Sequence, residues 1–205
     1  MVYLFDFDGT LFDTKLSLRP VYKSGFKAIG INDISNEECD TYMHYSLKQT
    51  LEMKGVSLDF FIPFATAILK ALDSEESLSL IKIFPEVKKT LDRIKSSNET
   101  IGLVSGNSSN HIRLVLKRFG LESYFKVIVG SDMYKNGKPD PEPILLGCKL
   151  LSIIPNNNVV YVGDSLQDEE CARRAGVSSF IVDRNKEYDD KTLKKGYSLF
   201  DLFKE

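Results

Sequence analysis

The sequence has little charge imbalance, few cysteines and no long apolar run. Its 205 residues carry a formal net charge of −2, which gives no electrostatic reason to expect nucleic acid or an anionic membrane as a partner. No apolar run is long enough to cross a bilayer. Asp6 follows at once on the N-terminal apolar residues, with no basic segment before them, so we expect no signal peptide.

The cysteines are few and scattered. Cys39, Cys148 and Cys171 are odd in number and contain no CxxC pair, which disfavours both a disulfide framework and a structural zinc site. Reduced thiols are typical of the cytoplasm, and we predict that location. Hydrophobic residues make up 42% and charged residues 27%, an ordinary balance for one globular domain or a domain with an insert.

Short apolar runs alternate with helical patterns over much of the chain. Five runs are apolar on both faces, as strands covered by helices on both sides would be. They are residues 2–5, 101–104, 127–129, 159–162 and 180–182. A helical pattern separates each of the last four from the run before it, and Gly120 is a suitable stop for one of these helices. This alternation predicts an α/β fold with a parallel sheet.

One long stretch breaks the alternation. Residues 15–80 show helical periodicity without a convincing strand, and the stretch is too long for a simple crossover connection. We therefore predict an all-helical cap domain at 15–80, inserted into a core domain formed by 1–14 and 81–205.

Polar groups follow the predicted strands at their carboxyl ends, which is where an open parallel sheet binds its ligands. In chain order these groups are Asp6 and Asp8, then Ser105, Gly106 and Asn107, then Lys138, and finally Asp164 and Asp168. We expect them to converge on one edge of the sheet.

The acidic residues of this set indicate a metal ion. Alternation along the strand turns Asp6 and Asp8 to the same side, and Asp164 adds a third carboxylate. Carboxylates this close repel one another unless a cation neutralises them. Oxygen ligands without nearby His or Cys favour Mg²⁺.

The remaining groups suit a phosphate. The Ser105 hydroxyl and the backbone amides of Gly106 and Asn107 are donors near a helix start. Lys138 supplies a positive charge that can balance phosphoryl oxygens. Together with the metal and a carboxylate able to act as nucleophile, they predict a phosphoryl-transfer site.

Four segments carry a family resemblance. DFDGTLFDT, LVSGNS, KPDPEPI and GDSLQDEECARRAG resemble, in this order, the four motifs of the haloacid dehalogenase-like (HAD) superfamily. The resemblance spans nearly the whole chain and is strongest to the subgroup containing phosphoglycolate phosphatase and β-phosphoglucomutase. It implies a Rossmann-like core with a helical cap inserted after the first motif. The cap is expected to close over the site and select the substrate.

The resemblance also implies catalytic roles. Asp6 would be the nucleophile that forms an aspartyl-phosphate, and Asp8 the acid and base that serves the leaving alcohol and then the attacking water. Ser105 would bind the transferring phosphoryl group, and Lys138 would stabilise its charge.

Binding roles follow in the same way. The Gly106 and Asn107 amides would assist Ser105 and Lys138 in holding the phosphate. The metal ligands of the same pattern are, in this chain, Asp6, the backbone carbonyl of Asp8, Asp164 and, through water, Asp168. Asp168 could instead orient Lys138.

The implied activity is Mg²⁺-dependent hydrolysis of a small phosphorylated metabolite by a monomer or homodimer. Asp8 favours phosphate esters, because the related dehalogenases and phosphonatases lack an aspartate there. One alternative is a phosphomutase of the β-phosphoglucomutase kind. The other is a non-catalytic HAD-like binding or regulatory protein.

Simpler interpretations exist for single residues. Asp6 and Asp8 could cap a turn, Asp164 and Asp168 could begin a helix, and a lone lysine is usually solvated. His111 is expected to be a partly exposed helix residue. The aromatic residues Phe60, Phe61 and Phe64 are expected to form the core of the cap.

Overall fold

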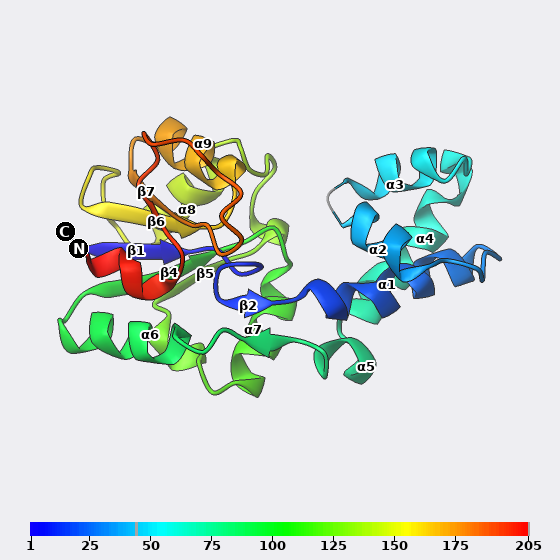
Figure 1. Cartoon of the computed structure of the whole chain (residues 1–205), viewed down its shortest axis with the longest axis horizontal. Coiled ribbons are helices and arrows are strands. Elements are labelled where there is room, and N and C mark those ends of the chain that lie inside the picture. The colour runs from blue at the N-terminus through cyan, green and yellow to red at the C-terminus, as the bar shows by residue number, and fades with distance from the viewer. Residues whose placement is uncertain (44, 205) are drawn as a thin grey trace. The chain divides into compact units, whose positions relative to one another are not determined.

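The computed structural model describes residues 1–43 and 45–204. The chain forms two compact units (Figure 1). The first unit comprises Met1–Asp13 and the residues from Ile83 onward, and the second comprises Thr14–Lys82. Every helix among the described residues is too short or too polar to span a membrane.

The first unit is built on a six-stranded parallel sheet with the strand order β5-β4-β1-β6-β7-β8. Its strands are β1 (Val2–Phe5), β4 (Thr100–Val104), β5 (Val127–Val129), β6 (Val159–Gly163), β7 (Ser178–Val182) and β8 (Lys195–Gly196). The five apolar runs thus coincide with five of the six strands, and the predicted parallel α/β fold is confirmed.

Helices cover both faces of this sheet (Figure 1), with α6 and α7 on one side and α8 and α9 on the other. Their bounds are α6 (Val87–Ser96), α7 (Ser109–Arg118), α8 (Glu142–Leu150) and α9 (Leu166–Ala175). Burial on both faces explains why the strands read as continuous apolar runs. Leu4 and Tyr161 are fully buried with Ile144 of α8 and Ala172 of α9 in one core cluster. Gly120 follows α7 with φ of +68°, as expected for a helix stop.

The regular structure in the described part of the second unit is helical, except that its last residue, Lys82, begins a short strand. Its helices are α1 (Lys15–Ala28), α2 (Asn36–Tyr42), α3 (Leu47–Met53), α4 (Phe61–Leu72), α5 (Glu75–Leu78) and the 3₁₀ turn η1 (Leu58–Phe60). The core forms mainly between α1 and α4, where the rings of Phe26 and Phe64 lie 4.9 Å apart between centroids. Ser35 and Ser46 each close a capping box that begins a helix, and this satisfies backbone amides that would otherwise lack partners.

The structure corrects three details of the sequence prediction. Three strands of only two residues were missed: β8 at the sheet edge, and β2 (Phe12–Asp13) paired with β3 (Lys82–Ile83) in a separate two-stranded sheet. Phe60 is 47% exposed and does not belong to the helical core, whereas Phe64 does. His111 is buried and its ring packs edge-on against Phe7.

Candidate functional site

Strand register places the candidate groups on one edge of the sheet. The last residue of β1, Phe5, is the partner of Leu103 in β4 and of Val162 in β6. The segments that follow β1, β4 and β6 therefore all begin at the same edge. The backbone also ties the first of them down, because the amide of Asp6 donates to the carbonyl of Val162 over 2.8 Å.

Lys138 joins two of the candidate carboxylates. Its Nζ lies 2.9 Å from Oδ1 of Asp6 and 2.6 Å from Oδ1 of Asp168. The side chains are 15%, 9% and 1% exposed, respectively, so solvent screens these contacts little. Burial alone would lower the pKa of Lys138, but the charges of Asp6 and Asp168 contribute to raising it well above its usual value. Lys138 is therefore a fixed positive charge.

Asp6, Asp164 and Asp168 form an acidic cluster, in which one oxygen of each carboxylate lies within 4.8 Å of the others. Burial, followed by the charges of neighbouring carboxylates, raises the pKa of Asp6 well above its usual value despite the contact with Lys138. Burial and the charge of Asp168 raise the pKa of Asp164 to about 7. The positive charge of Lys138 therefore does not offset the burial and mutual repulsion that act on Asp6 and Asp164.

This donor set fits a divalent cation. All three acids offer hard oxygen ligands, which suit Mg²⁺ or a similar ion. The carboxylate of Asp8 is not a member of this cluster.

Asp8 faces the segment after β4 instead. Its Oδ2 accepts a hydrogen bond of 2.7 Å from the side-chain amide of Asn107. The backbone amide of Asn107, expected to bind phosphate, donates here to Oγ of Ser105 over 3.1 Å. Ser105 itself is buried. A side chain at Gly106 would meet nothing within 4 Å, so that position borders open space.

Gly9 explains how the chain turns away directly after Asp8. Its φ is +68°, a conformation that L side chains rarely adopt. A Cβ atom at this position would lie 2.0 Å from Oδ2 of Asp164. Glycine is therefore required both by the turn and by the close approach of the turn to the acidic cluster.

Asp168 is held by both of its oxygens. One oxygen contacts Lys138, and the other accepts hydrogen bonds from the amides of Asp164 and Ser165 and from the Ser165 hydroxyl. The Ser165 hydroxyl oxygen accepts a hydrogen bond from the amide of Asp168, which completes a capping box at the start of α9. Asp168 thus fixes Lys138 relative to the end of β6.

Sequence reasoning missed two tyrosines that buttress the site. Tyr161 of β6 accepts a 3.3 Å hydrogen bond from Nζ of Lys138 and donates over 3.0 Å to the carbonyl of Val104. Tyr134 donates over 3.0 Å to the carbonyl of Ser105. The only signal for Tyr161 was a hydroxyl within an otherwise apolar strand, which is also common in strands without a site.

Known proteins share this sequence pattern and fold. The sequence model of a family described as haloacid dehalogenase-like hydrolase matches residues 3–182. A phosphoglycolate phosphatase of Aquifex aeolicus is 28% identical, over 98% of this chain and 95% of that protein. A phosphorylated carbohydrates phosphatase of Thermotoga maritima is 29% identical, over 85% of this chain and 81% of that protein. A pyrophosphatase of Oceanobacillus iheyensis is 28% identical, over 87% of this chain and 81% of that protein.

Solved structures agree with the fold. A structure from Bacteroides fragilis superposes with a TM-score of 0.78 and 29% identity, over 89% of this chain and 87% of that one. A hydrolase from Pseudomonas syringae superposes with a TM-score of 0.76 and 20% identity, over 98% and 95%. At the latter identity the likeness concerns the fold alone.

Proposed function

Because the chain belongs to the haloacid dehalogenase-like hydrolase family, we propose that it is a Mg²⁺-dependent phosphatase of a small phosphate monoester. The reaction would pass through an aspartyl-phosphate on Asp6. One observation carries this proposal: Asp6 lies 2.9 Å from Lys138 and belongs to a cluster of three carboxylates, of which Asp6 and Asp168 are buried. Few structural roles would justify such crowding of buried charge.

The first step uses Asp6 and Asp8. A carboxylate oxygen of Asp6 attacks phosphorus, and the bond between phosphorus and the ester oxygen breaks. Asp8, in its protonated form, gives its proton to the departing alkoxide. Lys138 balances negative charge on the phosphoryl oxygens and orients Asp6. The Ser105 hydroxyl and the amides of Gly106 and Asn107 would hold the same oxygens once the internal bond between Asn107 and Ser105 opens.

The second step returns the enzyme to its starting state. The carboxylate of Asp8 takes a proton from water, whose oxygen attacks the phosphorus of the aspartyl-phosphate. Inorganic phosphate leaves and the carboxylate of Asp6 is restored. Asn107 supports this role of Asp8, because its side-chain amide holds the Asp8 carboxylate by a 2.7 Å hydrogen bond.

The acidic cluster would hold the metal. We propose Asp6, Asp164 and the backbone carbonyl of Asp8 as ligands, with Asp168 acting through water and through Lys138. The cation would supply positive charge that neutralises the cluster and the phosphoryl oxygens. This assignment is supported by the raised pKa values of Asp6 and Asp164.

The names of the relatives indicate which substrates to test. They refer to phosphoglycolate, phosphorylated carbohydrates and pyrophosphate, all small phosphorylated compounds. We propose a substrate of this class and a cytoplasmic location, which the three free, buried cysteines support.

The decisive experiment measures phosphate release from a panel of such compounds with Mg²⁺, for the wild type and for Asp6→Asn. An amide cannot act as the nucleophile, so we expect kcat to fall by on the order of 10⁴-fold. Asp92→Asn is the matched control, because Asp92 lies on α6 and accepts from Tyr124 instead. A wild type that hydrolyses no ester of the panel, or an active Asp6→Asn variant with a normal circular dichroism spectrum, would refute the proposal.

A further inference from the structure

Arg184 connects three separate parts of the first unit. It is the second residue after β7, yet its guanidinium reaches the turn that follows Asp8. Its Nε donates to the carbonyl of Gly9 over 3.1 Å, and its Nη2 donates to the carbonyl of Thr10 over 2.9 Å. Nothing in the sequence around Arg184 predicted these contacts.

The other side of the guanidinium is equally engaged. Nη1 lies 2.5 Å from Oε1 of Glu86, and the central carbon lies 3.5 Å from the centroid of the Phe84 ring. The side chains of Arg184 and Glu86 are 19% and 7% exposed. The segment 84–86 also contacts the turn directly, because the amide of Phe84 donates to the carbonyl of Leu11 over 3.2 Å.

The turn formed by residues 9–12 needs support from outside, because the hydrogen bonds within it do not involve the carbonyls of Gly9 and Thr10. The amides of Leu11 and Phe12 both donate to the carbonyl of Phe7, and the amide of Gly9 donates to the carbonyl of Phe12. The carbonyls of Gly9 and Thr10 are the acceptors that Arg184 binds. Thr10 is fully buried, and a buried carbonyl deprived of its donor is costly.

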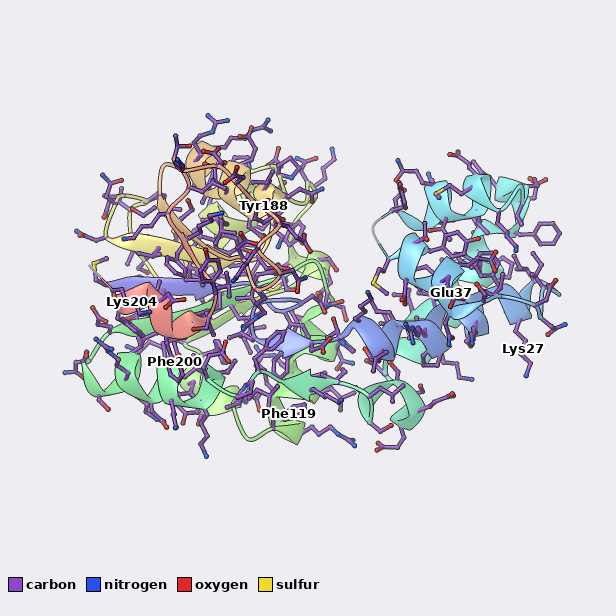
Figure 2. All side chains as sticks on the ribbon, viewed as in Figure 1. Lys27, Glu37, Phe119, Tyr188, Phe200 and Lys204 are labelled. Atoms are coloured by element: carbon purple, nitrogen blue, oxygen red, sulfur yellow. The ribbon has the colours of Figure 1, made fainter. Side chains whose placement is uncertain are left out.

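The loop that carries Arg184 is itself anchored. The carboxylate of Asp183 accepts from the amides of Glu187 and Tyr188 and from the ammonium of Lys195. Figure 2 labels Tyr188 on this loop between β7 and β8. Burial would raise the pKa of Asp183, but these bonds outweigh it and lower the pKa. Arg184 therefore extends from a fixed base.

We propose that Arg184 is a positioning residue, whose guanidinium fixes the turn after Asp8 and thereby the orientation of the Asp6–Asp8 segment. Gly9 directly follows Asp8 and comes so close to Asp164 that even a Cβ atom does not fit between them. A small shift of this turn would therefore have two effects at once: it would move Asp8, and it would disturb the acidic cluster. Misplacement of a catalytic group by about 1 Å can cost about 10²-fold in rate.

An arginine is required for this geometry. Three of its nitrogens point to three different acceptors while its flat face covers the Phe84 ring. Lysine offers one nitrogen on a flexible stem and cannot reproduce that arrangement. Replacing Arg184 with lysine keeps the charge that neutralises Glu86 but loses the fork that binds the two carbonyls.

The inference rests on the proposed function for its kinetic readout, and the test compares Arg184→Lys and Arg184→Met with the wild type. We expect kcat on the best substrate of the panel to fall tenfold or more in both variants. KM should stay within about threefold, since Arg184 serves to orient Asp8 and not to bind the ester. Arg93→Met is the matched control, because Arg93 also stacks on a ring, that of Phe203, at 4.0 Å.

A second readout needs no substrate. Hydrogen exchange at the amides of residues 9–12 should accelerate in both Arg184 variants relative to the amides of β1, β4 and β6, and stay unchanged in Arg93→Met. Unchanged kcat in a folded Arg184→Lys variant of an active enzyme would overturn the inference. If the wild type hydrolyses nothing, the proposed function fails, and unchanged exchange at residues 9–12 would then independently overturn the role of Arg184.

Discussion

A single hydroxyl group, that of Tyr161, links two segments of the candidate site. Burial raises the pKa of Tyr161 well above its usual value, so the hydroxyl keeps its proton and donates a hydrogen bond to the carbonyl of Val104. The same oxygen accepts from Lys138. We predict that Tyr161→Phe lowers the unfolding free energy by about 1–2 kcal/mol, the cost of an unsatisfied buried carbonyl. Because Lys138 loses a fixed partner, kcat should fall about tenfold, as measured by phosphate release.

Tyr134 provides a control of the same chemistry. Its hydroxyl donates over 3.0 Å to the carbonyl of Ser105, the residue after Val104. Tyr134→Phe therefore removes a similar hydrogen bond, and urea unfolding should reveal a loss of about 1 kcal/mol. Its kcat should fall less than that of Tyr161→Phe, because the Tyr134 hydroxyl supports the backbone of Ser105 and does not bond to Lys138. Equal losses of kcat in the two variants would show that the contact between Tyr161 and Lys138 is not responsible.

The limit of sequence reasoning at this scale lies in contacts across strands. The expectation that Asp6, Lys138 and Asp164 would meet followed from the rule that the carboxyl ends of parallel strands share one edge. Tyr161 and Arg184 escaped notice because their roles depend on which side chains stand opposite them. No local pattern encodes that information: a tyrosine in a strand and an arginine in a loop are both ordinary.

The packing of α1 on α4 offers a prediction about whole elements. A Cβ atom at Gly25 of α1 would lie 2.7 Å from Ile68 and 2.9 Å from Phe64, both on α4. Alanine gains about 1 kcal/mol in helix propensity over glycine, but overpacking a core costs about 1–3 kcal/mol. The cost of overpacking should exceed the gain in helix propensity, so Gly25→Ala should destabilise the second unit. We predict that Gly25→Ala accelerates hydrogen exchange in residues 14–82.

Gly147 of α8 is the matched control position, because there the gain in helix propensity should equal or exceed the cost of overpacking. Its added Cβ atom would approach Val104 only to 3.3 Å and Leu4 to 3.6 Å, so a small adjustment accommodates it. Gly147→Ala should leave the unfolding free energy unchanged or raise it by up to about 1 kcal/mol. Destabilisation by Gly147→Ala as large as that by Gly25→Ala would contradict this account of the two contacts.

Helices and strands were predicted correctly where the hydrophobic pattern was long enough to show a period. Each of the five apolar runs coincides with a strand, and the described residues between 15 and 80 form helices without a strand. The three two-residue strands, β2, β3 and β8, were missed because two residues show no alternation. Phe60 was misplaced in the helical core because η1 directly precedes α4 and turns the ring outward. Aromatic residues alone do not reveal that break.

At the scale of the whole molecule, metal binding should stabilise the first unit. The cluster of Asp6, Asp164 and Asp168 lies entirely within it. At a Mg²⁺ concentration about 100 times Kd, binding to the folded state alone adds about 2.7 kcal/mol, or roughly 5–10 °C in Tm. We predict such a rise over protein in EDTA, measured by calorimetry.

Two variants separate this effect from general charge screening. Asp164→Asn should abolish the Mg²⁺-dependent rise without lowering the Tm in EDTA, because it relieves crowding among buried carboxylates. Asp92→Asn on α6 should retain the full rise. An equal rise in all three proteins would mean that Mg²⁺ acts outside the cluster.

The division into two units yields the last prediction. The chain leaves the first unit at β2 and returns at β3, and these strands pair with each other. A short turn from Asp13 to Lys82 could therefore replace the helical unit. The first unit has its own buried core and contains every proposed catalytic residue. We expect the shortened protein to fold and to retain the Mg²⁺-dependent rise in Tm.

Its kinetics should show what the helical unit contributes. The shortened protein should hydrolyse an unhindered ester such as p-nitrophenyl phosphate slowly, because Asp6, Asp8 and Lys138 remain. It should lose discrimination among the esters of the panel, because the helical unit, the predicted cap, is expected to select the substrate and exclude water. Ratios of kcat/KM across the panel measure this directly. Ratios equal to those of the full chain would place specificity in the first unit, and a folded, Mg²⁺-binding but inert protein would make the helical unit part of the catalytic machinery.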